Sequence, residues 1–273
     1  MINEFQNTEF LKSLYGDKDL ISFRGEFMKK YSDRKFSLRS FIIKFLSQLK
    51  DKAILDIGCG NGSFLDKLNT EYPNNRYFGL DIAENIKCKD LKFLDYRIYD
   101  GKSFPDYQEK FDVIFCMHTM YHVEDFNSFF VKIKNYIKPN GIIVITTKSK
   151  FTFPKIESIF MKIVDNLNLK IHININKFRE ESRFCLENGL KILKKYFAKK
   201  SFIIDEHVIE TKIIVDNKKD LLKYIFSTNR YNFERKDIGK TLVDKYLDFW
   251  KKEIDREIFI DNYIEVVYLI KNV

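Results

Sequence analysis

The sequence predicts an α/β protein whose centre is a doubly wound, mostly parallel sheet. Short apolar runs alternate with amphipathic segments over residues 51–150. Two of the runs, FDVIFCM at 111–117 and GIIVITT at 141–147, are apolar at nearly every position. Parallel strands buried on both faces have this continuous apolar character. The turn LDIGCGNGSF at 55–64 joins a strand to a helix and indicates a ligand site at the carboxyl ends of the strands.

The expected elements follow one another in chain order. Residues 18–50 show helical periodicity, and a further helix opens at 63–68. The stop signal KPNG at 138–141 is expected to end the helix that precedes it. The remaining helices are expected at 126–137, 153–166, 183–198 and within 217–256. The strands are expected at 52–57, 76–81, 92–100, 111–117, 141–147, 201–204, 207–215 and 263–273.

These elements favour one structural domain in three sequence segments. Residues 1–50 form an amino-terminal helical cap, 51–150 form the core with the ligand site, and 151–273 complete the sheet and add a helical lid before the last strand. No linker, repeat or low-complexity tract separates them. A chain of 273 residues is long enough to bury a large core.

Composition narrows the class of protein. With 45% hydrophobic and 32% charged residues, the chain reads as a globular protein, and no apolar stretch approaches the length of a membrane span. The start of the chain lacks an apolar signal core, and the four cysteines show no pairing or metal-type spacing. Reduced thiols in the cytoplasm are therefore expected.

The net charge of +9 is concentrated in two segments outside the core, +4 over residues 1–50 and +7 over 150–200. An AT-rich genome would enrich lysine together with Asn, Ile, Phe and Tyr, and explains the excess without a function. Alternatively, the two basic segments meet near a site for an anionic substrate. Composition leaves both readings open.

The spacing of the glycines narrows the ligand. Gly58, Gly60 and Gly62 form G-x-G-x-G, whereas a dinucleotide fingerprint would be G-x-G-x-x-G. A phosphate-binding P-loop is excluded because no G-K-[ST] follows. The turn allows close approach of a ligand to the backbone but is not built for a diphosphate.

Acidic residues follow the next two strands. Asp81 ends the second strand, where a carboxylate can accept two hydrogen bonds from a ribose diol. Asp100, with Gly101, follows the third strand and offers an acceptor for an exocyclic amine such as that of adenine. One such acid is often only a helix cap, but acids after three successive strands, beginning with Asp56, predict an adenosyl site.

The motifs LDIGCGNG, FGLD, YDG, FDVIFCMHTMYHVED and IKPNGIIVITT together resemble those of class I S-adenosylmethionine-dependent methyltransferases, in the same order and spacing. Two flanking segments are similar to those of a bacterial group of small-molecule methyltransferases that includes types 11 and 12. These segments are GDKDLISFRGEFMKKYS and SRFCLENGLKILKKYF. The resemblance implies the Rossmann-like fold of that class, with a helical cap and lid, and S-adenosylmethionine as cofactor.

The resemblance also implies roles for individual residues. The glycine turn, which includes Cys59, would pass under the methionine part of the cofactor. Asp56 would orient the cofactor's amino group, and His118 would contact the methionine part. The remaining contacts implied are Asp81 on the ribose, Ile82 against the adenine, Asp100 and Gly101 on the adenine edge, and Arg24 with Tyr31 on the carboxylate.

His118 and His122 stand four residues apart in CMHTMYHVED. On a helix this spacing would suit zinc, but no Glu occupies position 119 and no third ligand is in view, so no metal is expected. A structural role at the strand end is one alternative. In the other, His122 or Tyr121 removes a proton from the acceptor, although many methyltransferases need no base.

The sequence thus predicts transfer of a methyl group to O or N of a small molecule, such as a sugar, a nucleotide-linked compound or a secondary-metabolite intermediate. The basic segments are compatible with a phosphorylated acceptor. The runner-up is an RNA or protein methyltransferase that docks its substrate on those segments. Absence of Pro-Cys and Asn/Asp-Pro-Pro-aromatic motifs disfavours nucleic-acid base methylation of those types. A non-catalytic cofactor-binding module is the third alternative, and no membrane partner is expected.

Overall fold

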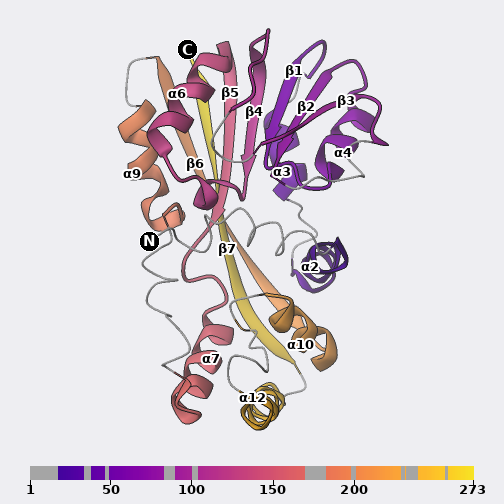
Figure 1. The fold of residues 1–273 in the computed structure, drawn as a ribbon, viewed down its shortest axis with the longest axis vertical. Helices are drawn as coiled ribbons and strands as arrows, with labels where there is room; N and C mark the ends of the chain where they lie inside the picture. Colours follow the sequence, from indigo (N-terminus) through magenta and orange to yellow (C-terminus); the bar gives the residue numbers. More distant parts are fainter. Residues whose placement is uncertain are drawn as a thin grey trace.

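The computed structural model describes residues 18–33, 38–46, 49–82, 90–99, 104–169, 183–197, 201–228, 231, 239–255 and 258–273. Its centre is one seven-stranded sheet in the order β3-β2-β1-β4-β5-β7-β6 (Figure 1). The strands are β1 (Ala53–Ile57), β2 (Arg76–Asp81), β3 (Leu94–Ile98), β4 (Phe111–Met117), β5 (Ile137–Lys148), β6 (Phe202–Val215) and β7 (Phe259–Asn272). β3, β2, β1, β4 and β5 pair in parallel, whereas β7 is antiparallel to β5 and β6 is antiparallel to β7.

Helices cover both faces of this sheet, as the continuous apolar strands require. The named helices are α2 (Lys18–Tyr31), α3 (Leu38–Phe45), α4 (Ser63–Glu71), the 3-10 turn η2 (Met120–His122), α6 (Phe126–Tyr136), α7 (Pro154–Asn166), α9 (Leu186–Phe197), α10 (Lys218–Ser227) and α12 (Lys240–Glu253). α6 and α9 bury their apolar side chains on one face, with Leu55 and Ile145. α3 and α4 pack on the other, with Ile54 and Val144.

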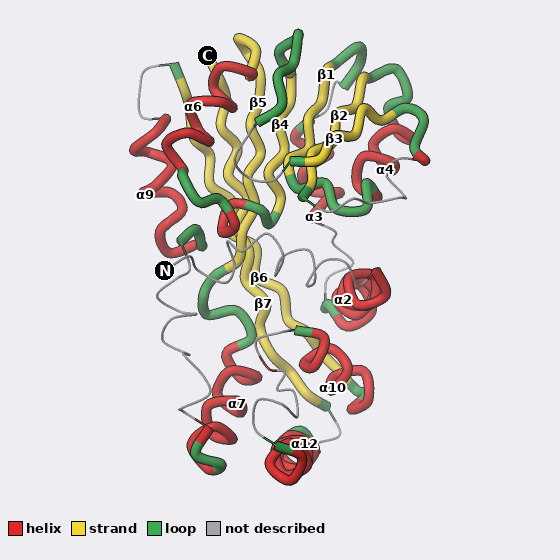
Figure 2. Tube along the Cα trace, viewed as in Figure 1, coloured by secondary structure: helices red, strands yellow, loops and turns green. Residues whose placement is uncertain are grey.

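A second hydrophobic cluster surrounds the far halves of β6 and β7. These strands run on below the rest of the sheet and are flanked there by α7, α10 and α12 (Figure 2). The buried aromatic residues of this cluster include Trp250, Tyr246 and Phe160. α2 joins it, since Phe27 stacks on Tyr224 with ring centroids 4.2 Å apart. The carboxyl end of β5 leads into α7, so the carboxyl ends of the parallel strands face this second cluster.

Two expectations about element boundaries were wrong. The strands expected at 201–204 and 207–215 are one continuous strand, because β6 pairs with β7 along its whole length. KPNG at 138–141 does end α6 at Tyr136, but it lies inside β5. The register there passes from Phe111↔Ile137 to Val113↔Ile142, so the extra residues of β5 form a bulge against β4.

The helical lid is more dispersed along the chain than expected. α7 follows β5, whereas α10 and α12 lie between β6 and β7. The expected cap also divides, since α2 belongs to the second cluster and α3 to a face of the sheet. The segment boundaries at residues 50 and 150 stay a prediction.

Candidate active site

The glycine turn after β1 depends on glycine for two reasons. Gly58, Gly60 and Gly62 have φ of 79°, 58° and 72°, in the left-handed region that other residues adopt only with strain. At Gly58 space is lacking as well, because an added Cβ would lie 2.1 Å from Oγ1 of Thr119. At Gly60 an added Cβ would meet none of the described residues within 4 Å, so they leave this part of the turn open.

The end of β2 holds the turn in place. The backbone N–H groups of Gly58 and Cys59 both donate to the carbonyl of Leu80, at 2.7 and 3.0 Å. The N–H of Gly60 donates to Oδ2 of Asp81 at 2.8 Å. The half-buried Asp81 carboxylate therefore stands directly beside the turn, at the carboxyl end of the neighbouring strand.

Asp56, the last but one residue of β1, is a buried carboxylate. Only 1% of its surface is exposed, and its Oδ1 has no hydrogen-bond partner among the residues that the structure describes. Burial raises the pKa of Asp56 to about 7, opposed by the nearby Arg39 guanidinium and reinforced by Asp81. A buried oxygen without a partner is costly, so this atom is placed to meet a donor other than the residues that the structure describes.

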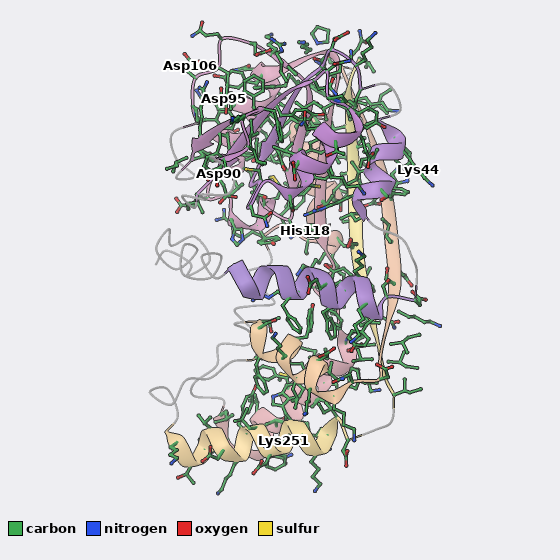
Figure 3. The ribbon with its side chains drawn as sticks, turned by 90° about the vertical axis from the view of Figure 1, so that its right-hand side faces the viewer. Lys44, Asp90, Asp95, Asp106, His118 and Lys251 are labelled. Carbon is green, nitrogen blue, oxygen red and sulfur yellow. The ribbon has the colours of Figure 1, made fainter. Side chains whose placement is uncertain are left out.

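The segment after β4 closes the other side of the turn. His118 has φ of 52°, and its N–H donates to the carbonyl of Thr146 at 3.0 Å. Figure 3 shows His118 at the end of the upper half of the molecule that faces α2. Its Nδ1 is buried, with no hydrogen-bond partner in the described part of the chain. Burial, with Lys148 and Arg39 nearby, lowers the pKa of His118 to about 3, so the ring stays neutral at physiological pH.

Tyr121 and His122 lie in the turn η2, which follows directly. Their rings are 4.4 Å apart, and the N–H of His122 donates to the carbonyl of Thr119 at 2.9 Å. Tyr121 lies close enough to Tyr263 of β7 to raise the pKa of that phenol, together with burial and Glu265. The expected role of either residue as a base stays a prediction.

Arg24 and Tyr31 of α2 make contacts other than the expected ones. Nε of Arg24 donates to Oγ of Ser227 at 3.2 Å, and the hydroxyl of Tyr31 donates to Oδ2 of Asp220 at 2.6 Å. Both partners belong to α10, because α2 packs along that helix. These contacts orient both side chains toward α10 rather than the turn, and their expected role on the cofactor carboxylate remains untested.

Other predicted residues are placed in part or not at all. Ile82, directly after β2, is half-buried. Asp100 and Gly101 lie outside the described residues. Arg183, shortly before α9, donates through its guanidinium to the carbonyl of Glu124 at 2.5 Å and so fixes the segment after η2.

Four further residues of this region were not predicted from the sequence. Arg39 of α3 approaches Asp56 while its guanidinium donates to Oγ of Ser63 at 3.2 Å. Thr119 fills the space beside Gly58. The pair Lys148 and Glu265 lies opposite each other on β5 and β7. A carboxylate inside the apolar run YIEVVYLI was the signal that could have pointed to Glu265.

Metal ligation and membrane insertion gain no support. Within the described ranges, no group of three or more His, Cys, Asp or Glu side chains could hold a metal ion. Among those same residues, no helix is long and apolar enough to cross a bilayer. Cys116, predicted to belong to the core, is fully buried in β4.

The geometry fits a ligand that combines a flat, polar nucleoside with a cationic group. An open glycine turn lies between two carboxylates, Asp56 and Asp81. One of them is buried with an oxygen that lacks a donor, which suits an ammonium group. S-adenosylmethionine, expected from the sequence, has both features.

Comparison with known proteins supports this assignment. A family model described as a methyltransferase domain matches residues 29–190, more than half of the chain. A malonyl-[acyl-carrier protein] O-methyltransferase of Ilyobacter polytropus is 31% identical over 106 residues, which are 37% of this chain and 40% of that protein. A tRNA U34 carboxymethyltransferase of Campylobacter jejuni is 28% identical over 110 residues, 38% of each chain. The chain thus matches about two fifths of the length of these curated relatives.

Solved structures resemble the whole chain. The plantazolicin methyltransferase BpumL in complex with SAH has a TM-score of 0.55 at 16% identity, covering 96% of this chain and 93% of its own. A phosphoethanolamine N-methyltransferase of Haemonchus contortus in complex with S-adenosyl-L-methionine has a TM-score of 0.54 at 17% identity, covering 99% and 60%. At such identities the likeness concerns the fold, and it confirms the Rossmann-like sheet. The recognition as a class I methyltransferase is confirmed too, and the chain belongs to the methyltransferase-domain family.

Proposed function

We propose that this protein is an S-adenosylmethionine-dependent methyltransferase that acts on an oxygen or nitrogen atom of a small-molecule acceptor. One observation carries the proposal. The buried Asp56 carboxylate, with an oxygen that lacks a donor, stands beside a glycine turn that Asp81 holds open. Family membership supports the same reading.

Different residues around the glycine turn would bind different parts of the cofactor. Asp56 would accept hydrogen bonds from the amino group of the cofactor, and the ionised form of Asp56 is favoured when that cation arrives. Asp81 would accept from the ribose hydroxyls while it continues to hold Gly60. Arg39, on the same side of the sheet as Asp56, is suited to the cofactor's carboxylate.

S-adenosylmethionine supplies a methyl group already activated on a sulfonium sulfur. The protein therefore has to position the acceptor, exclude water and handle any proton that the acceptor loses. The neutral His118 ring at the end of β4 could accept a hydrogen bond there but would not carry a proton at neutral pH. Its neutrality avoids a positive charge beside a cationic donor of the methyl group.

The acceptor is proposed to be a small molecule because the carboxyl ends of the strands face a second helical cluster rather than an open face (Figure 1). The relatives matched include enzymes named for an acyl-carrier protein and for tRNA, and plantazolicin and phosphoethanolamine enzymes share the fold. These names cover several acceptor classes, so the acceptor must be sought by experiment.

Binding of the cofactor product tests the proposal. Calorimetry should show one S-adenosylhomocysteine site on the protein, and Asp81→Ala should weaken it severely, roughly 100-fold, as loss of hydrogen bonds to a charged group does. Asp248→Ala is the control, since this carboxylate lies on the surface of α12, 3.1 Å from Lys251. Absence of binding to the unmodified protein would refute the proposal. Unchanged affinity in Asp81→Ala would show that the ribose is held elsewhere.

A further inference from the structure

A charged pair lies at the carboxyl edge of the sheet, on the same face as Asp56. Lys148, the last residue of β5, is the register partner of Glu265 on β7. Directly opposite residues of an antiparallel pair project from the same face of the sheet. Asp56 of β1 pairs with Phe115 of β4, which pairs with Val144 of β5, so these three side chains project from one face of the sheet. Lys148 lies four residues after Val144 on β5, and because side chains alternate along a strand it projects from the same face.

This pair adjoins the region where the methyl group would be transferred. Lys148 is close enough to His118 to contribute to lowering the pKa of that imidazole. His118 in turn donates its N–H to Thr146, two residues before Lys148. Tyr263, two residues before Glu265 on β7, is close to both Glu265 and Tyr121. Thr119 lies against Gly58 of the glycine turn, His118 precedes Thr119 in the chain, and Lys148, which acts electrostatically on His118, is the register partner of Glu265.

Glu265 is not explained by the packing around it. Only 8% of its surface is exposed, and the residues that follow it on β7 are apolar and buried. Glutamate is almost never fully buried unless it is paired, and a leucine or valine would continue the apolar strand at no cost of desolvation. Glu265 and its register partner Lys148 therefore place two opposite charges in an otherwise apolar stretch of the sheet, beside the site.

We propose that Glu265 is the group that accepts the proton lost by the methyl acceptor, with Lys148 as the residue that orients it. This inference rests on the proposed methyltransferase function and concerns the same site. The acceptor's attacking atom would form a bond to the methyl carbon as the carbon–sulfur bond breaks, and the electron pair of that bond stays on sulfur. The proton of the attacking atom passes to the Glu265 carboxylate, so charge and atoms balance.

The protonation state of Glu265 suits this role. Burial raises the pKa of Glu265 to about 7, and the Lys148 ammonium opposes the rise. The other titratable groups close by are Tyr263 on the same strand and, next to Tyr263, Tyr121 of η2 and Tyr224 of α10. Burial raises the pKa of Tyr263 and of Tyr224 and so keeps these two phenols neutral. A carboxylate that titrates near neutral pH can both take and release a proton during turnover.

The inference also narrows the class of acceptor. A base is useful only when the attacking atom carries a proton that is lost in the reaction, as in an alcohol, a phenol or a neutral primary or secondary amine. A carboxylate acceptor needs no base and would be repelled by an ionised Glu265. The geometry therefore points to a hydroxyl or amine acceptor rather than the carboxyl group of an acid.

The first experiment measures the carboxyl group itself. Infrared difference spectra of the protein bound to S-adenosylhomocysteine, compared with Glu265→Gln, should show one carboxyl group that titrates near pH 7 and is missing from the variant. Lys148→Met should move its midpoint to higher pH, because the neighbouring ammonium is lost. A carboxyl group that remains ionised at pH 5 would overturn the proposal whatever the kinetics show.

The second experiment measures turnover on a probe set of catechol, tyramine and benzoate, through release of S-adenosylhomocysteine. Glu265→Gln should lower kcat on catechol or tyramine about 100- to 10,000-fold and remove the acid limb of the pH profile. The affinity of Glu265→Gln for S-adenosylhomocysteine should stay within about threefold of that of the unmodified protein. This change is well below the effect of losing one hydrogen bond to a charged group. Glu210→Gln, on an exposed neighbouring position of β6, should change none of these values.

The outcomes separate the two proposals. If the unmodified protein fails to bind S-adenosylhomocysteine, the methyltransferase function fails and this inference fails with it. If binding is intact but Glu265→Gln keeps both the rate and the pH profile, only the role of Glu265 is wrong. Methylation of benzoate alone would likewise overturn it. If no probe is methylated, the pH midpoint of the Glu265 carboxyl group in the infrared spectra decides whether the role of Glu265 is retained.

Discussion

At the scale of single residues, the buried Asp56 gives the protein a pH dependence of stability with a definite sign. Its pKa rises from the ordinary value of 3.8 to about 7 because folding removes the carboxyl group from water. Between these two pH values the folded state binds more protons than the unfolded one, so the unfolding free energy falls as pH rises. Below about pH 4 and above about pH 7, Asp56 adds no further dependence.

The variant Asp56→Asn isolates this contribution. Relative to that variant, the ligand-free protein should lose stability as pH rises from 5 to 7, by up to about 1.4 kcal/mol per pH unit. Urea unfolding at several pH values measures the difference, and Glu265 and other groups cancel because both proteins contain them. A difference that is flat, or that grows with pH, would show that Asp56 is ionised in the folded protein.

Residues that act within one short stretch were predictable, and residues that meet across the sheet were not. The three glycines and Asp56 could be predicted from their spacing in LDIGCGNG, because their roles depend on one local turn. Lys148 and Glu265 meet only through the register of β5 on β7, which no local pattern specifies. Arg39 reaches Asp56 only through the packing of α3 on the sheet.

At the scale of elements, the same distinction holds. β1, β2 and β4 begin and end within a residue of their predicted bounds, because they are continuous apolar runs closed by turns. The charged residues at 205–206 suggested a break in β6, but pairing with β7 carries the strand through them. Edge position explains this tolerance, since one side of an edge strand can expose polar side chains.

One contact ties a helix of the second cluster to the sheet. The residue before α7, Phe153, has φ of 55° and offers no side-chain cap. The carboxylate of Asp261 on β7 takes this place, accepting from the N–H groups of Lys155 at 3.1 Å and Ile156 at 2.8 Å. Asp261 is thus a helix cap supplied from a distant strand.

Removing this cap should destabilise the protein measurably. Asp261→Ala leaves two N–H groups without this acceptor, the buried one of Ile156 and the partly buried one of Lys155, and should lower the unfolding free energy by about 1–3 kcal/mol. Asp205→Ala is the control, because Asp205 only makes an exposed ion pair with Lys271 and should cost less than about 1 kcal/mol. Urea denaturation of both variants measures the difference. Equal losses in the two would show that α7 begins without help from β7.

At the scale of the whole molecule, β6 and β7 join the two hydrophobic clusters. Their upper halves complete the sheet beside β5, and their lower halves carry α7, α10 and α12 (Figure 2). α2 is held to α10 within the second cluster, through Arg24 and Ser227 and through Lys30 and Asp220. The carboxyl ends of the parallel strands therefore face helices that the same two long strands hold in position.

The distribution of charge over the molecule bears on the RNA alternative. In the part of the chain that the structure describes, several basic side chains on both halves are paired with acids. Asp112 forms ion pairs with both Lys52 and Lys138, and the ammonium nitrogen of Lys162 lies 2.6 Å from a carboxylate oxygen of Glu253. A surface for RNA requires a patch of cations that release counterions from phosphates, and neutralised cations contribute little to it.

We therefore predict weak binding to polyanions in spite of the net charge of +9. Fluorescence anisotropy with a labelled 20-nucleotide poly(U) should give a Kd weaker than about 10 µM at physiological salt, in the range of non-specific binding. Lys52→Glu together with Lys138→Glu is the control, since reversing two paired cations should change this weak affinity by less than about tenfold. Submicromolar binding that falls steeply with salt would instead support RNA as the substrate. It would also direct the search for the acceptor away from small molecules and toward nucleotides.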